Sequence, residues 1–360
     1  MRRTAAAVAA VVATAVGAQQ DTGLGRARRV AEQELTAGNA AAAETALESA
    51  GAGVHDATVE IALVRTYMQR GEYRRALAFA AHAAGEHGDY AAAGALYAWL
   101  LHAGGQQRVA SRLLDSAFAA APADAVLLAV RERLASPSPT ATGALLVPPA
   151  RFAPYATGAA AEGRTVASAV LIDGGRRALA SVAVGGLLWL RNGIGGTARA
   201  SVERRFEVAG AALTLLRLET PLPSPENVAV AERVPFAGSV GVAVEYAATP
   251  ARSEAAWPWL RLGFFGRAPS ATALPALGID MPPGPRGGPV FDDAGRLVGL
   301  ALRTVDMRDL LVPAAMLPDE LRALLGVPSP GGPTPRAPLD LTYERSLLLA
   351  LQVIAADATR

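Results

Sequence analysis

The chain has 360 residues, 51% apolar and 18% charged, with four histidines and no cysteine. Without cysteine it can form no disulfide, thiol nucleophile or thiolate metal site. All 34 basic residues are arginines, so no lysine can act as a general base, a Schiff base or a phosphate anchor. The formal net charge of +2 gives no electrostatic reason to expect a nucleic acid or an acidic membrane as partner.

The N-terminal segment predicts export. Residues 1–18, MRRTAAAVAAVVATAVGA, join a basic start to an uncharged Ala/Val run and end in small residues. This is the layout of a secretory signal peptide with cleavage after Ala18. The apolar run is shorter than the roughly 20 residues that a spanning helix needs, so we expect no membrane span in the mature chain. Loss of two arginines brings its formal charge to zero, and we expect a periplasmic or secreted protein.

The first half of the chain contains an internal repeat. Gly38, Gly71 and Gly105 lie 33 and 34 residues apart, and small or apolar residues recur at the same distances after each one. Glycine turns the chain between two helices, and small residues let those helices approach closely. The pattern resembles the tetratricopeptide repeat, which implies an α-helical array over residues 24–135 with a capping helix at its end. The alternative is an Ala-rich bundle with an accidental period.

Arrays of this kind leave a concave surface that usually binds peptide segments of partner proteins. Tyr67 and Tyr73 are the candidate binding residues on that face. All the histidines fall in this half: His55, His82, His87 and His102. The last three give no i, i+4 pair and no carboxylate partner stands out, so we expect solvated helix faces and neither a metal nor a cofactor.

The composition changes at Ser136. Residues 136–164 are rich in Pro, Ser, Thr, Ala and Gly and predict a linker. Residues 165–326 contain short β-branched runs separated by turns, among them Asn192-Gly193, a strong hairpin signal. This region is therefore expected to be predominantly β-structure, apart from one helical stretch over residues 318–326.

Three segments of this region resemble, in order, the catalytic segments of trypsin-like serine proteases: VASAVLIDGGRRALASVAVGG, GAALTLLRLE and GPRGGPVFDDAGRLVGLAL. The resemblance implies an all-β double barrel over residues 165–326. It places Ala183 where that family has its catalytic histidine and Ala212 where it has the aspartate. Arg286 stands in the place of the nucleophilic serine.

These substitutions remove the expected chemistry. Alanine can neither accept the serine proton nor orient an imidazole, and the arginine guanidinium stays protonated. Residues 136–360 contain no His, Lys or Cys, so the usual bases for activating a hydroxyl are missing. The chain is therefore predicted not to be an enzyme. The alternative is a hydrolase that uses relocated residues, with Ser181 and Thr214 as candidate hydroxyls.

Arg286 has two interpretations. The resemblance implies an oxyanion loop at Gly284, Arg286 and Gly287, whose amides together with the guanidinium would form a pocket for a carboxylate. The other interpretation is an exposed arginine that fills the vacated site or pairs with a local aspartate. Pro285 also departs from the family pattern and puts the shape of the loop in doubt.

The chain is expected to end with a linker at 327–339 and a helix at 340–360. The whole sequence thus predicts a multidomain, exported, non-catalytic scaffold that binds a protein or peptide through the repeats and the degenerate protease domain. A further alternative is that the repeats bind alone and the barrel is a spacer.

Overall fold

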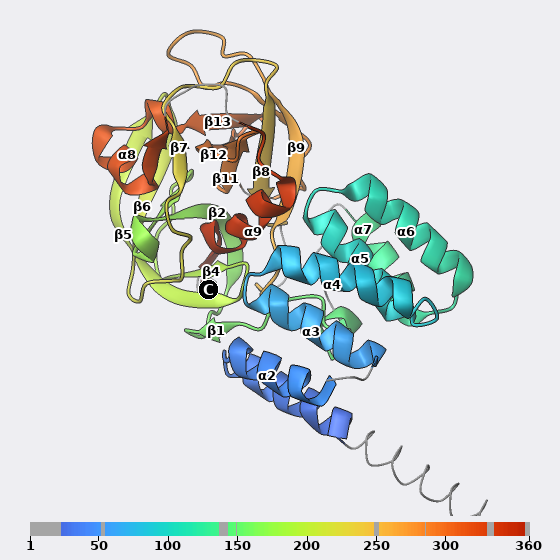
Figure 1. Ribbon diagram of the computed structural model, residues 1–360. Helices are drawn as coiled ribbons and strands as arrows, with labels where there is room; N and C mark the ends of the chain where they lie inside the picture. The colour runs from blue at the N-terminus through green and yellow to red at the C-terminus, as the bar shows by residue number, and fades with distance from the viewer. Residues whose placement is uncertain are drawn as a thin grey trace, which may run out of the picture.

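The computed structural model describes residues 23–51, 55–136, 143–148, 150–247, 252–284, 286–329 and 335–356. Figure 1 shows two parts side by side, a helical array from the N-terminal third of the chain and a β-rich part from the rest. The signal peptide predicted for residues 1–18 lies outside the described residues. No helix in the described ranges is both long and apolar enough to cross a bilayer.

The helical part consists of stacked pairs. A helix described over residues 23–36 is followed by α2 (Ala40–Gly51), α3 (Ala57–Gln69), α4 (Tyr73–Glu86), α5 (Ala91–Ala103), α6 (Gln107–Ala120) and α7 (Ala125–Ala135). Gly38, Gly71 and Gly105 lie in the turn inside each pair with φ of +87°, +79° and +90°, a left-handed backbone that favours glycine. The predicted helical array is confirmed, and its identity as a tetratricopeptide array stays a prediction.

The first sheet closes into a ring in the order β5–β4–β15–β2–β3–β6, and β6 pairs again with β5. Every pairing in this ring is antiparallel. A core of small and branched apolar side chains fills it, and β1 (Thr157–Gly158) adds to β5 in parallel. The ring strands are β2 (Arg164–Ile172), β3 (Arg177–Ala180), β4 (Leu188–Asn192), β5 (Gly196–Val208), β6 (Ala211–Leu218) and β15 (Ala350–Ala355).

The end of the chain differs from the prediction of a helix over residues 340–360. Helix α9 spans Leu339–Leu349, and β15 then inserts between β2 and β4. Leu351 and Val353 belong to the barrel core. The prediction of one continuous helix is wrong because an apolar run this short does not distinguish a buried helix from a buried strand. The first barrel is completed by the last strand of the chain.

The second sheet closes nearly as fully, in the antiparallel order β10–β9–β8–β11–β12–β13. An isolated bridge joins Ala276 to Leu310, and the Leu311 amide donates to the Pro275 carbonyl at 2.9 Å. The strands are β8 (Val240–Glu245), β9 (Trp259–Phe265), β10 (Leu277–Ile279), β11 (Pro289–Asp292), β12 (Leu297–Arg303) and β13 (Asp309–Pro313). The double β-barrel that the resemblance predicts is therefore present.

The edges of the barrels extend beyond the predicted boundaries of 165–326. Two short strands, β7 (Ala229–Ala231) and β14 (Val327–Ser329), pair in parallel beside β12, and helix α8 (Asp319–Leu325) lies between β13 and β14 in the sequence. Residues 327–329 are thus part of the second sheet. The prediction of a linker from 327 onwards is wrong for these three residues, because their backbone pairs with β7.

The linker predicted for residues 136–164 is packed against the helices in its described part. Helix η1 (Gly143–Leu146) contacts α7, and the ring of Phe152 lies 5.7 Å from that of Trp99 in α5. Phe152 is 1% exposed. The overall composition of this segment did not reveal that a few of its apolar side chains are buried against the helices. The connector is therefore a packed segment and not a free linker.

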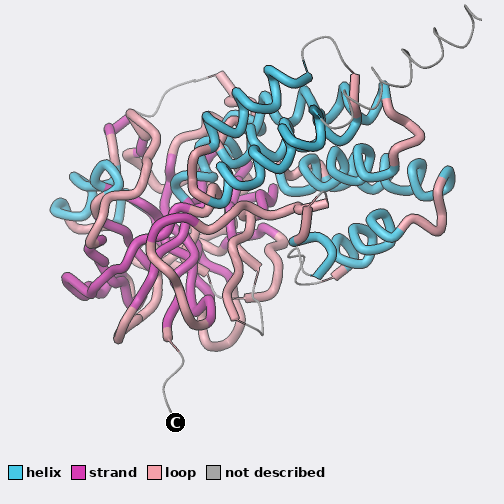
Figure 2. Tube along the Cα trace, turned by 90° about the horizontal axis from the view of Figure 1, so that it is seen from below, coloured by secondary structure: helices cyan, strands magenta, loops and turns pink. Residues whose placement is uncertain are grey.

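Helix α9 lies between the array and the barrels. The ring of Tyr343 in α9 meets that of Tyr73 in α4 edge-on at 4.5 Å, and its hydroxyl donates to the Pro258 carbonyl at 2.8 Å. Nearby, His102 of α5 meets Trp259 of β9 edge-on at 4.8 Å. Figure 2 shows the helices of the array gathered against one side of the strands, and a single apolar core runs through both parts. Array and barrels therefore form one body.

Candidate functional site

Hydrogen bonds bring the three expected triad segments together. Thr214 of β6 donates its hydroxyl to the Val182 carbonyl at 2.8 Å, in the loop after β3. Ser181 of that loop donates to the Ala301 carbonyl of β12 at 2.7 Å, and the Ala301 amide donates to the Gly288 carbonyl at 3.0 Å. Segments far apart in the sequence thus meet at one place, called the triad region below: residues 181–184, 212–214, 284 and 286–288.

The first barrel contributes only methyl groups at its two expected triad positions. Ala183 is exposed in the loop between β3 and β4, and Ala212 is exposed near the start of β6. Neither side chain can accept a proton or donate a hydrogen bond. That these positions correspond to the histidine and aspartate of the protease family stays a prediction.

The two candidate hydroxyls for relocated catalysis are buried. Ser181 is 1% exposed and Thr214 is fully buried. Each hydroxyl proton is directed at a backbone carbonyl, that of Ala301 or Val182. A nucleophile needs both access to substrate and a base that takes its proton, and neither hydroxyl has access in this structure.

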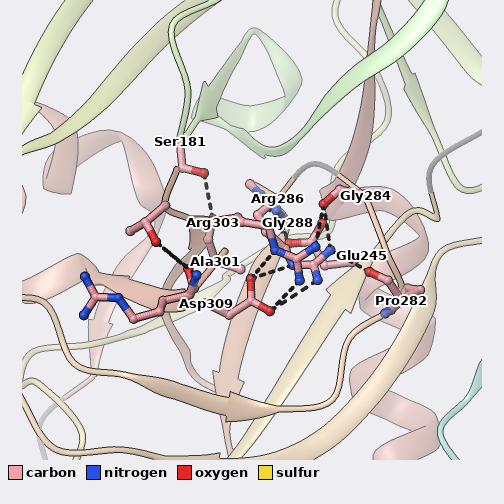
Figure 3. Close-up of polar contacts among 12 residues, drawn as sticks. Ser181, Glu245, Pro282, Gly284, Arg286, Gly288, Ala301, Arg303 and Asp309 are labelled. Carbon is pink, nitrogen blue, oxygen red and sulfur yellow. Dashed lines mark hydrogen bonds and ion pairs between the residues drawn. The ribbon is translucent and has the colours of Figure 1, made fainter. Parts of the chain in front are cut away.

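Arg286 turns its side chain into the second barrel, where the guanidinium is fully buried. It donates from Nη1 to the carbonyls of Pro282 at 2.8 Å and Gly284 at 3.1 Å. Nε and Nη2 donate to the two carboxylate oxygens of Asp309 at 3.1 and 3.3 Å. Figure 3 shows the guanidinium enclosed by these acceptors. Four of its five N–H bonds are directed at protein oxygens.

This geometry decides between the two interpretations of Arg286. The idea that its guanidinium lines an anion pocket is wrong, because the group is buried and its donors already have acceptors. Arg286 pairs with a local aspartate instead, although it is buried and not exposed as that interpretation supposed. At the place expected for the nucleophile, the side chain is part of the protein's interior.

Asp309 lies between two arginines. Arg303 donates to the same carboxylate from Nε and Nη2 at 2.8 and 2.7 Å, and from Nη1 to the Gly284 carbonyl at 3.2 Å. Burial alone would raise the pKa of Asp309, but hydrogen bonds from Arg303 and Arg286 and their charges hold that pKa below its usual value. The carboxylate therefore stays ionised and fixes both guanidinium groups.

Glu245, at the end of β8, is a second buried carboxyl behind the same loop. Its Oε1 accepts from the amides of Gly287 at 3.2 Å and Gly288 at 2.9 Å. Burial raises the pKa of Glu245 to about 7, against the lowering effect of the Arg286 charge and the two amides. A carboxyl with such a pKa is a candidate general base, but here it is used to hold the backbone of the loop.

The expected oxyanion loop is locked by the same groups. The Gly284 carbonyl accepts from both arginines, and the Gly287 amide points at Glu245. Gly287 has φ of +134°, and a Cβ there would lie 2.0 Å from the Ser168 carbonyl oxygen. Glycine at 287 is thus explained by close packing of the two barrels and needs no ligand.

The structure places Tyr73 in the interior of the array and Tyr67 at the edge of a pocket. Tyr73 is fully buried, and its hydroxyl donates to the Leu100 carbonyl at 2.9 Å. Its predicted role in peptide binding is wrong, because it packs the array against α9. Tyr67 is 2% exposed and lies under the Arg75 guanidinium, 4.0 Å from the ring centre, at the edge of a pocket between α3 and α4.

The connector after α7 packs on residues of the first helix, α3 and α5. The Tyr155 amide donates to Oε1 of Gln69 in α3 at 2.8 Å, and the Gln69 amide group donates back to the Tyr155 carbonyl at 3.1 Å. The Tyr155 hydroxyl bonds to Glu32 of the first helix. These residues of the array are therefore covered by the chain itself.

Sequence reasoning missed Asp309, Arg303 and Glu245. The sequence did contain a signal for Glu245, because it lies inside the apolar run GVAVEYAA and a buried acid is rarely without partners. Asp309 had none, since its pairing with Arg286 depends on the register of β12 and β13. The three residues become visible only once the strands are placed.

No protein-family model matches the chain, and no curated protein matches its sequence. Among solved structures, it is similar to the apo form of the MamO protease domain from Magnetospirillum magneticum. That match has 19% identity and a TM-score of 0.32, and covers 46% of this chain and 94% of the other. A likeness of that size carries no conclusion about function.

Proposed function

We propose that the protein is a non-catalytic binding protein, in which a trypsin-like double barrel without a working triad is joined to a helical array. The observation that carries this proposal is the buried Arg286. The side chain at the place expected for the nucleophile is held by Asp309 and two carbonyls. No His, Lys or Cys occurs in residues 136–360 to activate another hydroxyl.

The alternative of a hydrolase with relocated residues has weaker support. Its hydroxyls, Ser181 and Thr214, are buried and directed at carbonyls. Glu245 has a pKa of about 7, which suits a general base, but its Oε1 accepts from two amides of the loop. Both hydroxyls and this carboxyl would have to move before substrate reached them.

The partner in this proposal is a protein or peptide, and the location is periplasmic or secreted, as residues 1–18 suggest. The alternative in which the repeats bind alone beside a spacer barrel has little support, since both parts share one core. The connector covers Gln69 and Glu32 of the array, and the exposed residues around Ala183 and Ala212 are the surface that we propose for the partner.

Site-specific photo-crosslinking in the cells that produce the protein tests this proposal. A crosslinking residue is placed at Ala183 or Ala212 in the triad region, or at the exposed Arg112 of α6 as the matched control. The proposal expects one discrete protein adduct from the first two positions and none from the third. The absence of any adduct at Ala183 and Ala212 would show that this surface does not bind.

A further inference from the structure

The pocket between α3 and α4 brings together residues that the sequence kept apart. His55 lies just before α3, Glu60 in its first turn and His82 on α4. One ligand atom from each of the three lies within 4.8 Å of the other two. All three line a pocket of ≈ 430 Å³ together with Tyr67 and other side chains. Two imidazoles and a carboxylate thus converge on one space.

The helix start fixes this arrangement. Asp56 caps α3, accepting on Oδ1 from the amides of Thr58 at 2.9 Å and Val59 at 3.0 Å. A capped first turn holds the flanking residues in defined positions, so His55 and Glu60 face each other across the cap. His55 Nδ1 lies 3.4 Å from Glu60 Oε1. Two ligands of a tetrahedral zinc ion, each bound at about 2.1 Å, are separated by about 3.4 Å.

Glu60 is an unusual carboxylate. Its side chain is 8% exposed, and its Oε2 is buried without a hydrogen bond among the described residues. His87 Nε2 lies 3.4 Å from that oxygen and is likewise buried without a hydrogen bond in the described part of the chain. A buried carboxylate oxygen without a partner is costly. A turn of the His87 ring that lets it donate to Oε2 would satisfy both groups and would leave Oε1 of Glu60 available to a cation.

We propose that His55, Glu60 and His82 form a zinc-binding site. Two imidazole nitrogens and one carboxylate oxygen are a ligand set that zinc accepts, whereas magnesium and calcium prefer oxygen ligands alone. His55 and His82 are exposed, so their rings can rotate to close the remaining distance. The fourth coordination position faces the pocket and takes a water molecule. His87 acts behind the site, as an outer partner that orients Glu60.

Zinc titration of the untagged, chelator-treated mature protein tests the proposal. Isothermal titration calorimetry is expected to give one ion per chain, and cobalt is expected to give the visible absorption of a tetrahedral site. His82→Ala changes an exposed residue, so folding should be retained, and it should weaken zinc binding by more than about 100-fold. Loss of an outer partner alone costs about 10- to 100-fold, which is the effect expected for His87→Ala.

Two carboxylate variants complete the test. Glu60→Gln should weaken binding as strongly as His82→Ala. Glu48→Gln, which changes another carboxyl of the same pocket outside the three ligands, should bind zinc like the wild type. Saturating zinc should raise the melting temperature of the wild type and of Glu48→Gln but not of His82→Ala. No binding at micromolar zinc, or wild-type affinity in both His82→Ala and Glu60→Gln, would overturn the proposal.

Discussion

The two barrels fill their sides of the triad region in opposite ways. The first barrel presents exposed methyl groups at Ala183 and Ala212. The second buries Arg286 among carbonyls and Asp309. An exposed alanine needs no specific partners, whereas a buried guanidinium destabilises the fold unless its hydrogen-bond and charge partners are present. The first barrel thus leaves its two expected triad positions without a functional group, whereas the second barrel fills the expected nucleophile position with a buried residue that has partners in the fold.

The barrels also differ in how they close. The second barrel is built from strands that lie between residues 240 and 313, while the first takes β15 from the end of the chain. In β15, Leu351, Val353 and Ile354 are fully buried. The first barrel should therefore fail to fold when the chain is shortened, whereas its exposed positions Ala183 and Ala212 should tolerate substitution.

The largest effect is expected from a chain that stops at Leu349. Burial of each apolar side chain contributes about 1.5–3 kcal/mol, so the loss of three costs about 4.5–9 kcal/mol, which is comparable to the whole stability of an ordinary domain. We expect no cooperative unfolding transition by circular dichroism. Val353→Asp should have a similar effect and Ala212→Asp on the same barrel should not. An unchanged transition in the shortened chain would show that β15 is dispensable.

Arg286→Ser should lower the free energy of unfolding by about 2–3 kcal/mol. Removal of one partner of a buried ion pair costs about 3–5 kcal/mol, and the retained pairing of Asp309 with Arg303 reduces that cost here. The matched control is Arg204→Ser, because Arg204 forms an exposed pair with Glu320 that contributes at most about 1 kcal/mol. Urea denaturation measures both, and equal small effects would mean that Arg286 is not part of the interior.

Glu245 should make stability depend on pH. Its folded pKa of about 7 lies above its usual value of 4.5, so the folded state binds the proton more tightly than the unfolded state. The free energy of unfolding should therefore fall as the pH rises from about 4.5 to 7, by up to about 3 kcal/mol. Glu245→Gln should remove this decline, and Glu219→Gln, at an exposed position, should keep it. Parallel pH profiles for wild type and Glu245→Gln would contradict the assignment.

Much of this architecture could be predicted from local patterns. The repeating glycines predicted the helical pairs, because the turn between two helices needs a left-handed backbone conformation and this conformation favours glycine. Period-2 runs and turn residues predicted the β-structure in the same way. The predictions of a linker over residues 136–164 and of a helix over residues 340–360 were wrong, because Phe152 and Val353 are buried by residues that are distant in the sequence. No local pattern encodes which surface such a side chain will meet.

The same limit applies to the sites. The absence of His, Lys and Cys after residue 136 could be read directly from the sequence, and it constrains the chemistry most strongly. The pairing of Arg286 with Asp309 could not, because it depends on which strands are neighbours. The convergence of His55 and His82 on Glu60 was also hidden. His55 precedes α3 and His82 lies on α4, and only the packing of these two helices brings the residues together.

The smallest effect on stability is expected from Ala183→His combined with Ala212→Asp. Both positions are exposed, and such changes usually alter stability by no more than about 0.5 kcal/mol. Addition of Arg286→Ser should lower the free energy of unfolding by the amount that this single change costs and no more. The triple variant should gain detectable cleavage of a peptide or ester. Chemical denaturation and a hydrolysis assay measure the two effects. A triple variant that folds but remains inert would count against the alignment of the three positions.

Hydrolysis by the wild-type protein tests the central claim most directly. The purified mature chain is incubated with fluorogenic peptides, esters and a serine-reactive fluorophosphonate probe from about pH 5 to 9, which covers ionisation of Glu245. The account predicts no turnover above buffer and no labelling. Turnover or labelling that persists on repurification and disappears in Ser181→Ala or Thr214→Ala would contradict it.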